Sequence, residues 1–427
     1  MITTKSYYVL SYNPAMPNAP HPHRWRIAIL LGAGVLVNYF DRVNLSVSYG
    51  VLSREFGLST IAFGYLLSAY SWSYALCQIP AGALLDRFGV RIVGRSSTLI
   101  WSLASFASSL SIGMRQFFAS RLLLGVGEAP TFPANAKAIG AWFPENERGL
   151  ATACFDAAAK FASAIGVPIM GLLLFHMGWR WTFAATGLAS FAYFLAFTIV
   201  YREPPTSESA TRETVQSEEN VSLEFLLTQR KVVGLAIGSA AYNYCFYLLL
   251  TWLPGYLALT LHLNLLQSVW YTSIPWLVAT ATDLIVGGWL VDALIRHGYD
   301  ASRVRQSVLI GGTLLGEAIF AAGSATTPRA AVFWISISLG GLAAAAPVGW
   351  SVPGLIAPRG GVGRVGGIMN FFSQVAAISA PIITGYVVAI THSFKAAFWL
   401  AAIFLAIGIA AYALLLGKIE RIELHRP

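Results

Sequence analysis

Charged residues are scarce in this chain of 427 residues: Asp, Glu, Lys and Arg together make up only 11%. A soluble domain carries about 25% charged residues. Because a charge in hydrocarbon costs several kcal/mol, a deficit of this size is typical of helices that face lipid. The composition therefore argues against a soluble globular protein and favours a membrane protein.

Cysteine and histidine are also few. The three cysteines all lie inside apolar runs without the spacing of metal ligands, and the seven histidines are scattered without a zinc motif. No nucleophile–base pair stands out either. We therefore expect no metal site, no cofactor and no enzymatic activity.

Basic residues are in excess, with a net charge of +9, but no basic stripe with interleaved aromatic residues is present. This pattern argues against nucleic acid as a partner. Residues 1–26 are polar and Pro-rich, and the apolar segment that follows is long and is succeeded by many more. We therefore expect an N-terminal tail and not a signal peptide.

Hydrophobic residues dominate the rest of the chain and make up 56% of the whole. A membrane-spanning helix needs about 20 mainly apolar residues. Twelve segments meet this requirement, at 27–50, 61–85, 92–113, 116–140, 148–175, 180–201, 232–259, 267–292, 306–325, 330–356, 365–391 and 395–417. The predicted fold class is an all-α membrane protein with twelve transmembrane helices in two six-helix halves.

One long polar stretch divides the twelve segments into these halves. The predicted parts are a cytoplasmic N-terminal tail at 1–26, a first half at 27–201, a cytoplasmic linker at 202–230, a second half at 231–417 and a C-terminal tail at 418–427. With both termini in the cytoplasm, twenty Lys and Arg residues fall on the cytoplasmic side and five on the outer side. The positive-inside rule then predicts a multi-pass protein of the cell inner membrane with both termini cytoplasmic.

The two halves carry the same short motif at matching places. The second segment ends in GALLDRFGVR at 82–91, and the eighth ends in GWLVDALIRHG at 288–298. Two parallel repeats with a site between them are the architecture of one large class of secondary transporters. The alternative is an ordinary positive-inside loop with a chance aspartate, and the repetition argues against it. The candidate gating residues are Gly82, Asp86, Arg87, Arg91 and Asp292.

Ionisable residues inside the apolar segments are the strongest functional signal in a membrane protein. Arg121 and Glu128 are seven residues apart and share a helix face, while Asp156 and Lys160 are four apart and can pair along one helix. The alternative is that these charges form structural salt bridges, and for Asp156–Lys160 that alternative stays open. The full set is Asp41, Arg42, Arg121, Glu128, Asp156, Lys160, Asp283 and Glu317.

The motif at 82–91 resembles the signature loop of the major facilitator superfamily. Further stretches resemble the anion:cation symporter branch of that superfamily, which includes bacterial galactonate, glucarate and hexuronate importers and animal carriers of sialic acid and glutamate. The likeness covers nearly the whole chain. The stretches are NYFDRVN at 38–44, RLLLGVGEAPTFPAN at 121–135, YNY at 242–244, TWLP at 251–254 and GGIMNFFSQ at 366–374.

The resemblance implies roles for individual residues. Asp41 and Glu128 match the proton-linked acids of the sugar-acid importers, and Arg121 matches the arginine coupled to them. Residues that match substrate contacts are Tyr39, Arg42, Tyr74, Trp350 and Asn370, with Lys160 and Gln374 as secondary candidates. From the residues alone, the aromatic side chains and the asparagine are equally compatible with helix packing.

Two positions depart from the galactonate carriers that the chain resembles. A glutamine that contacts galactonate corresponds to Ala159, and a serine corresponds to Pro347. The substrate pocket is therefore expected to differ from that of a galactonate carrier.

These observations predict a secondary transporter that imports an organic anion, a sugar acid or small carboxylate, by proton symport with alternating access. The forked guanidinium of Arg42 suits a carboxylate, and protonation of Asp41 and Glu128 would leave positive charge for the anion. The alternatives are a proton-coupled exporter or an anion exchanger of the same fold, and a transporter-like sensor. The expected partners are a small organic anion, protons and the lipid bilayer, with the monomer as the functional unit.

Overall fold

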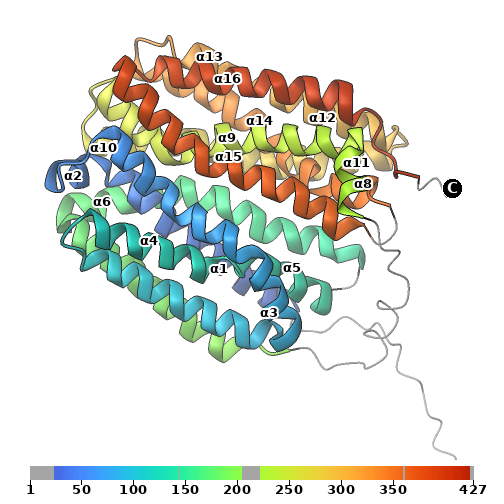
Figure 1. Ribbon diagram of the computed structural model, residues 1–427, viewed down its shortest axis with the longest axis horizontal. Coiled ribbons are helices and arrows are strands. Elements are labelled where there is room, and N and C mark those ends of the chain that lie inside the picture. Colours follow the sequence, from blue (N-terminus) through green and yellow to red (C-terminus); the bar gives the residue numbers. More distant parts are fainter. Residues whose placement is uncertain (1–23, 144, 204–221, 359–360, 424–427) are drawn as a thin grey trace, which may run out of the picture.

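The computed structural model describes residues 24–143, 145–203, 222–358 and 361–423, and in these ranges the chain is helical without β-strands (Figure 1). The predicted N-terminal tail up to residue 23, most of the predicted linker (204–221) and residues 424–427 lie outside the described residues.

The first half contains α1 (Arg24–Val47), α2 (Tyr49–Glu55), α3 (Thr60–Ser109), α4 (Met114–Glu128), α5 (Thr131–Trp142) and α6 (Glu145–Val200). The second half contains α8 (Leu223–Thr228), α9 (Arg230–Leu259), α10 (Leu265–Thr282), the π-helix η1 (Asp283–Leu290), α11 (Val291–Arg296), α12 (Ala301–Gly316), α13 (Ala318–Ala322), α14 (Pro328–Ile356), α15 (Val362–Thr391), α16 (Lys395–Ala410) and the π-helix η2 (Ala411–Leu416).

The two longest helices each contain two of the predicted spans. α3 is broken at Gly89, with φ of 75°, and α6 is broken at Gly178, with φ of 76°. Side chains other than glycine rarely adopt this backbone region, so each glycine permits a sharp reversal between consecutive spans. The breaks fall in the predicted gaps 85–92 and 175–180.

Other spans consist of consecutive helices: α4 with α5, α10 with η1 and α11, α12 with α13, and α16 with η2. Seven described helices are long and apolar enough to cross a membrane by length and composition alone. The remaining spans are shorter, more polar or merged into a broken helix. Combined in this way, the helices reproduce the twelve predicted spans, and the predicted fold class is confirmed.

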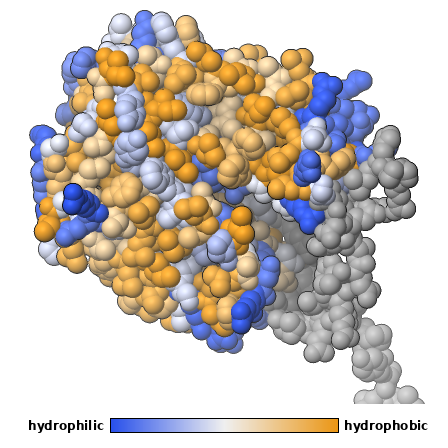
Figure 2. Space-filling model, in the orientation of Figure 1, coloured by the Kyte–Doolittle hydropathy of each residue, from blue (hydrophilic) through white to orange (hydrophobic). Residues whose placement is uncertain are grey.

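The helices form two bundles, one coloured blue to green and one coloured yellow to red (Figure 1). Large apolar side chains such as Ile29, Leu188 and Ile390 are exposed on their outsides. Hydrophobic residues cover much of the visible face, and strongly hydrophilic ones gather towards its left and right ends (Figure 2). This distribution fits a protein whose middle zone is surrounded by lipid.

The two bundles are tightly joined at the end that carries α2. Ser46 donates a hydrogen bond to the carbonyl of Thr251 at 2.7 Å, and Thr60 donates one to the carbonyl of Gly385 at 3.1 Å. α3 and α15 approach so closely that a Cβ at Gly64 would lie 2.6 Å from the carbonyl oxygen of Pro381. The interface between the two bundles is therefore closed at this end, and the helix backbones lie close together there.

We predict that Gly64→Val opens this interface. Overpacking a close contact costs about 1–3 kcal/mol, enough to shift a conformational equilibrium several-fold. Spin labels at the exposed positions Met177 and Ile390, in a cysteine-free background, should report a longer distance between the halves. The control is Gly50→Val, because an added Cβ at Gly50 meets nothing within 4 Å. Equal distances in both variants would contradict the close packing described here.

Candidate functional site

Arg42 of α1 and Glu128, the last residue of α4, form an ion pair inside the first half. The Nε and Nη2 atoms of Arg42 donate to Oε2 of Glu128 at 3.3 and 3.1 Å. The side chains are only 6% and 0% exposed. A buried charge is tolerated only when it is paired, so each residue compensates the other.

Three tyrosines surround the guanidinium of Arg42. Its central carbon lies 4.4 Å from the ring centroid of Tyr39, 4.5 Å from that of Tyr70 and 5.8 Å from that of Tyr74. Such cation–π contacts fix the orientation of the cation. The sequence reasoning missed Tyr70, although it precedes Tyr74 by four residues and therefore lies on the same helix face.

Asp41 lies beside this pair but points to different partners. Ser105 donates to its Oδ1 at 2.6 Å and Ser190 donates to its Oδ2 at 3.1 Å. Arg121 donates from Nη1 to the backbone carbonyl of Asp41 at 3.2 Å. These two serines were not anticipated, because hydroxyl side chains in apolar segments give no distinct sequence signal.

Glu128 pairs with Arg42 and not with Arg121, although sequence spacing places Arg121 on its own helix face. Seven residues of helix separate Arg121 from Glu128 by about 10 Å along the axis, too far for a direct ion pair. In the described part of the chain, Oε1 of Glu128 and Nε of Arg121 are buried without a hydrogen-bond partner. The free carboxylate oxygen can accept a proton without losing an existing bond.

A second charged cluster joins the two halves. Lys160 of α6 lies 2.7 Å from Oδ2 of Asp156 on the same helix and 3.3 Å from Oδ2 of Asp283 on η1. The predicted pairing of Asp156 with Lys160 is present, and Asp283 is a third member that sequence spacing could not identify. Glu317 lies apart from this cluster, at the boundary between α12 and α13.

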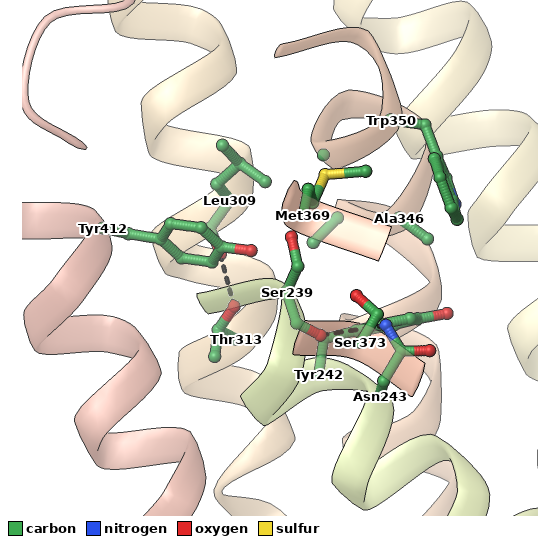
Figure 3. Close-up of a pocket in the computed structure, with 12 residues that line it drawn as sticks. Ser239, Tyr242, Asn243, Leu309, Thr313, Ala346, Trp350, Met369, Ser373 and Tyr412 are labelled. Carbon is green, nitrogen blue, oxygen red and sulfur yellow. Dashed lines mark hydrogen bonds between the residues drawn. The ribbon is translucent and has the colours of Figure 1, made fainter. Parts of the chain in front are cut away.

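The second half contributes a small cavity of about 30 Å³ (Figure 3). Ser239, Tyr242 and Asn243 line it from α9, and Trp350 lines it from α14. Figure 3 shows Tyr412 and Thr313 at one side of the cavity, Trp350 at the other, and Ser239, Tyr242 and Asn243 between them.

The other predicted substrate residues of this half lie close to the cavity in sequence. Asn370 and Gln374 follow its lining residues Met369 and Ser373 directly on α15, but do not themselves line it. Of the two departing positions, Ala159 is buried, and Pro347 lies where a Cβ at Gly287 would be 2.9 Å from its ring. Pro347 therefore closes the gap between α14 and η1.

The candidate gating residues lie at the end of the molecule opposite α2. Asp86 pairs with Lys137 of α5 at 2.7 Å, within its own half and not with an arginine across the interface. Lys137 also donates to the carbonyl of Leu85 at 2.9 Å. The motif analysis did not identify Lys137 as the partner of Asp86, because the two residues are 51 positions apart along the chain.

The remaining gating residues also make local contacts. The backbone N–H of Arg91 donates to Oε1 of Glu203 at 2.8 Å, and the guanidinium of Arg87 lies 5.2 Å from the ring centroid of Phe88. An added Cβ at Gly82 would meet nothing within 4 Å, so no described helix packs closely against this glycine. Asp292 lies in the first turn of α11, where its carbonyl accepts a bond from Arg296.

Comparison with known proteins adds sequence relatives along almost the full length. The family described as Major Facilitator Superfamily matches residues 31–340. An uncharacterized transporter, YybO of Bacillus subtilis (strain 168), is 37% identical over 422 residues, which cover 95% of this chain and 97% of that protein. The probable galactarate/D-glucarate transporter GarP of Escherichia coli (strain K12) is 31% identical and covers 94% of this chain and 97% of its own length.

Solved structures agree on the fold. A bacterial homolog of the human lysosomal transporter Spinster, in an inward-facing and occupied conformation, matches with a TM-score of 0.75 at 17% identity and covers 93% of this chain and 97% of that chain. A D-xylose-proton symporter matches with a TM-score of 0.71 at 17% identity, and the match covers 92% of this chain and 98% of that chain. At these identities the likeness concerns the fold alone.

Proposed function

The chain belongs to the major facilitator superfamily, and from that premise we propose that it imports an organic anion, a sugar acid, by proton symport. It is a multi-pass membrane transporter and not an enzyme. The observation that carries the proposal is the Arg42–Glu128 pair inside its cage of tyrosines. The relative GarP, named for two sugar acids, supports the substrate class.

Arg42 is the proposed anion site. Its planar fork can bind a carboxylate through two parallel hydrogen bonds, whereas now both Nε and Nη2 donate to the single oxygen Oε2 of Glu128. The tyrosine rings hold the fork in place and offer an apolar surface to the carbon chain of the substrate. Glu128 now occupies the place that we propose for the substrate carboxylate.

Proton uptake and anion binding then follow from one exchange of partners. A proton added to Glu128 removes its negative charge and releases Arg42 for the substrate carboxylate. Because protonation raises the affinity for the anion, the anion must raise the affinity for the proton by the same factor. Asp41, with two serine donors and Arg121 nearby, is proposed to share this one proton with Glu128.

Access alternates as the two halves rock about this centre. We propose that both termini are cytoplasmic, which makes the closed end near α2 the outer end and the conformation inward-facing. The monomer contains both halves and is the proposed functional unit. The motif residues at the inner end, with the Asp86–Lys137 pair, would stabilise particular positions of the halves.

An exporter or an anion exchanger of the same fold is the rival. The test is uptake by proteoliposomes of a panel of radiolabelled sugar acids and small carboxylates, with and without an inward proton gradient. Import by symport predicts accumulation above equilibrium only with the gradient. Uptake that requires a counter-anion inside, and ignores the gradient, would indicate an exchanger.

We predict that Asp86→Asn lowers the transport rate by up to about fivefold, since an exposed ion pair contributes at most about 1 kcal/mol. The affinity for substrate should stay within about twofold, because Asp86 lies at the inner end, away from Arg42. Initial uptake rates and equilibrium binding measure the two effects separately. Lys137→Gln should reproduce the result, whereas lost binding with a normal transport rate would contradict it.

A further inference from the structure

The Asp156–Lys160–Asp283 cluster repeats the arrangement of the Arg42 centre. In each, a buried basic side chain pairs with one oxygen of a carboxylate, and the other oxygen of that carboxylate is buried without a partner among the described residues: Oε1 of Glu128 and Oδ1 of Asp283. The Lys160 and Asp283 side chains are 5% and 3% exposed. Each centre therefore pairs a buried cation with a carboxylate that has one oxygen free to accept a proton.

Two tyrosines connect the centres. Tyr39 lies against Arg42 and interacts electrostatically with Lys160 as well. Tyr242 interacts with Lys160, Asp283 and Tyr39, and it also lines the cavity of the second half. Both cations therefore lie near enough to Tyr39 to act on it.

The backbone at Asp283 is also unusual. Asp283 begins η1, a π-helical stretch of eight residues between α10 and α11. Wide turns of this kind are rare and occur frequently at functional sites. A purely structural ion pair gives no reason for Asp283 to keep an unpartnered oxygen at such a position.

We propose that Lys160 binds a second carboxylate of the substrate, so that the transporter selects organic anions with two carboxyl groups, and that Asp283 takes up a second proton. The inference rests on the proposed function and specifies its substrate class. Asp156 stays bound to Lys160 and orients it, while the substrate replaces Asp283. A site that holds a single carboxylate needs only Arg42. The cluster of Asp156, Lys160 and Asp283 provides the place for the second carboxylate.

The charges balance in this exchange. One substrate carboxylate pairs with Arg42 as a proton binds Glu128, and the other pairs with Lys160 as a proton binds Asp283. The dianion brings two negative charges and the two protons neutralise them, so the buried site keeps its charge. A monoanion would engage Arg42 and one proton only.

Few other groups influence Asp283. Lys160 and Asp156 face it from α6, and Tyr242 faces it from α9. Within α10 no residue is charged, and in α14 the only charged residue is Arg329, in the first turn. Asp292 and Arg296 of α11 lie more than two helical turns farther along. The protonation of Asp283 is thus expected to depend mainly on Lys160 and its partners.

Galactarate and galactonate form a matched pair for the test, because they share a carbon chain and differ in one terminal carboxyl group. In proteoliposomes the wild type should transport galactarate with two protons and galactonate with one, measured from the pH gradient that just balances a known substrate gradient. Lys160→Gln should weaken the transport affinity for galactarate by about tenfold more than the affinity for galactonate. Lys160→Arg should retain the preference for galactarate over galactonate. Asp283→Asn should reduce the number of protons transported with each galactarate to one.

The outcomes separate the two levels of the proposal. Equal proton ratios and affinities for the two acids in the wild type would overturn the second carboxylate site and leave the proposed function intact. An equal loss for both acids in Lys160→Gln would assign Lys160 a structural role. No proton-driven uptake of any anion in the panel would reject the proposed function itself. If Lys160→Gln does not fold, the wild-type proton ratios decide the question alone.

Discussion

Arg42→Ala is expected to weaken binding of the organic anion by roughly 30-fold or more, because removing one partner of a buried charge pair costs about 2–5 kcal/mol. The guanidinium is the only group in the tyrosine cage that offers two parallel donors to a carboxylate. Arg42→Lys should restore the affinity only in part, since lysine lacks the planar fork. Titration calorimetry on the purified transporter with a transported sugar acid measures both effects.

Two control variants make this result specific. Arg42→Ala leaves Glu128 buried with a charge and without its partner, so the double variant Arg42→Ala/Glu128→Gln removes that side effect. It should bind as weakly as Arg42→Ala. Recovery of affinity in the double variant would mean that Arg42 serves to neutralise Glu128, and near-normal affinity in Arg42→Ala would move the anion site to Arg121 or Lys160.

Glu128→Gln is expected to abolish uphill uptake of a monocarboxylate such as galactonate while leaving exchange of labelled for unlabelled substrate intact. The amide mimics the protonated acid permanently, so the substrate can bind and cross but no proton can be released inside. A gradient of one pH unit can sustain about tenfold accumulation for one coupled proton, and this factor should fall to about one. Counterflow and gradient-driven uptake in the same vesicles separate the two activities. Asp41→Asn should impair the same step if the two acids share it.

Glu55→Gln is the matched control for Glu128→Gln. Glu55 lies at the end of α2, where the hydrogen bond from Arg180 keeps the pKa of the Glu55 carboxyl below its usual value. Its charge is therefore expected to be constant through the transport cycle, and its loss should not affect accumulation. If Glu128→Gln still accumulates substrate on a proton gradient, Glu128 is a structural partner of Arg42 and does not couple the proton.

The span pattern was predictable because each helix must bury its backbone polar groups over a fixed thickness of hydrocarbon. Runs of apolar residues therefore reveal the spans, and polar breaks at positions such as Gly89 and Gly178 reveal the turns. The helices inside one span were less predictable. Pro130 separates α4 from α5, and the change to π-helix at Asp283 has no sequence signal that we identified.

The membership of the charged centre was predictable, but its pairing was not. Charges inside apolar segments must find partners, so Asp41, Arg42, Arg121 and Glu128 could be selected from sequence. Which of them pair depends on how α1 and α4 pack, and this places Glu128 against Arg42. The same limit applies to Asp86 and Lys137, which are 51 residues apart along the chain.

Resemblance supplied the roles of the aromatic residues, and the structure adds their geometry. Tyr39 and Tyr74 lie around Arg42 as the resemblance suggests for substrate-site residues, and Tyr70 joins them. Their contact with substrate remains a prediction. Trp350 lines the cavity of the second half, whereas Asn370 and Gln374 would need a different position of α15 to reach it.

The most direct test of the account is proton movement driven by the substrate alone. Purified transporter in proteoliposomes, with equal pH on both sides and a permeant ion to prevent a membrane potential, should respond to external galactonate by making the external medium more alkaline. The response should vanish in Glu128→Gln and persist in Glu55→Gln. Entry of the labelled acid without any change of external pH would contradict proton symport and, with it, the proposed exchange of partners at Arg42.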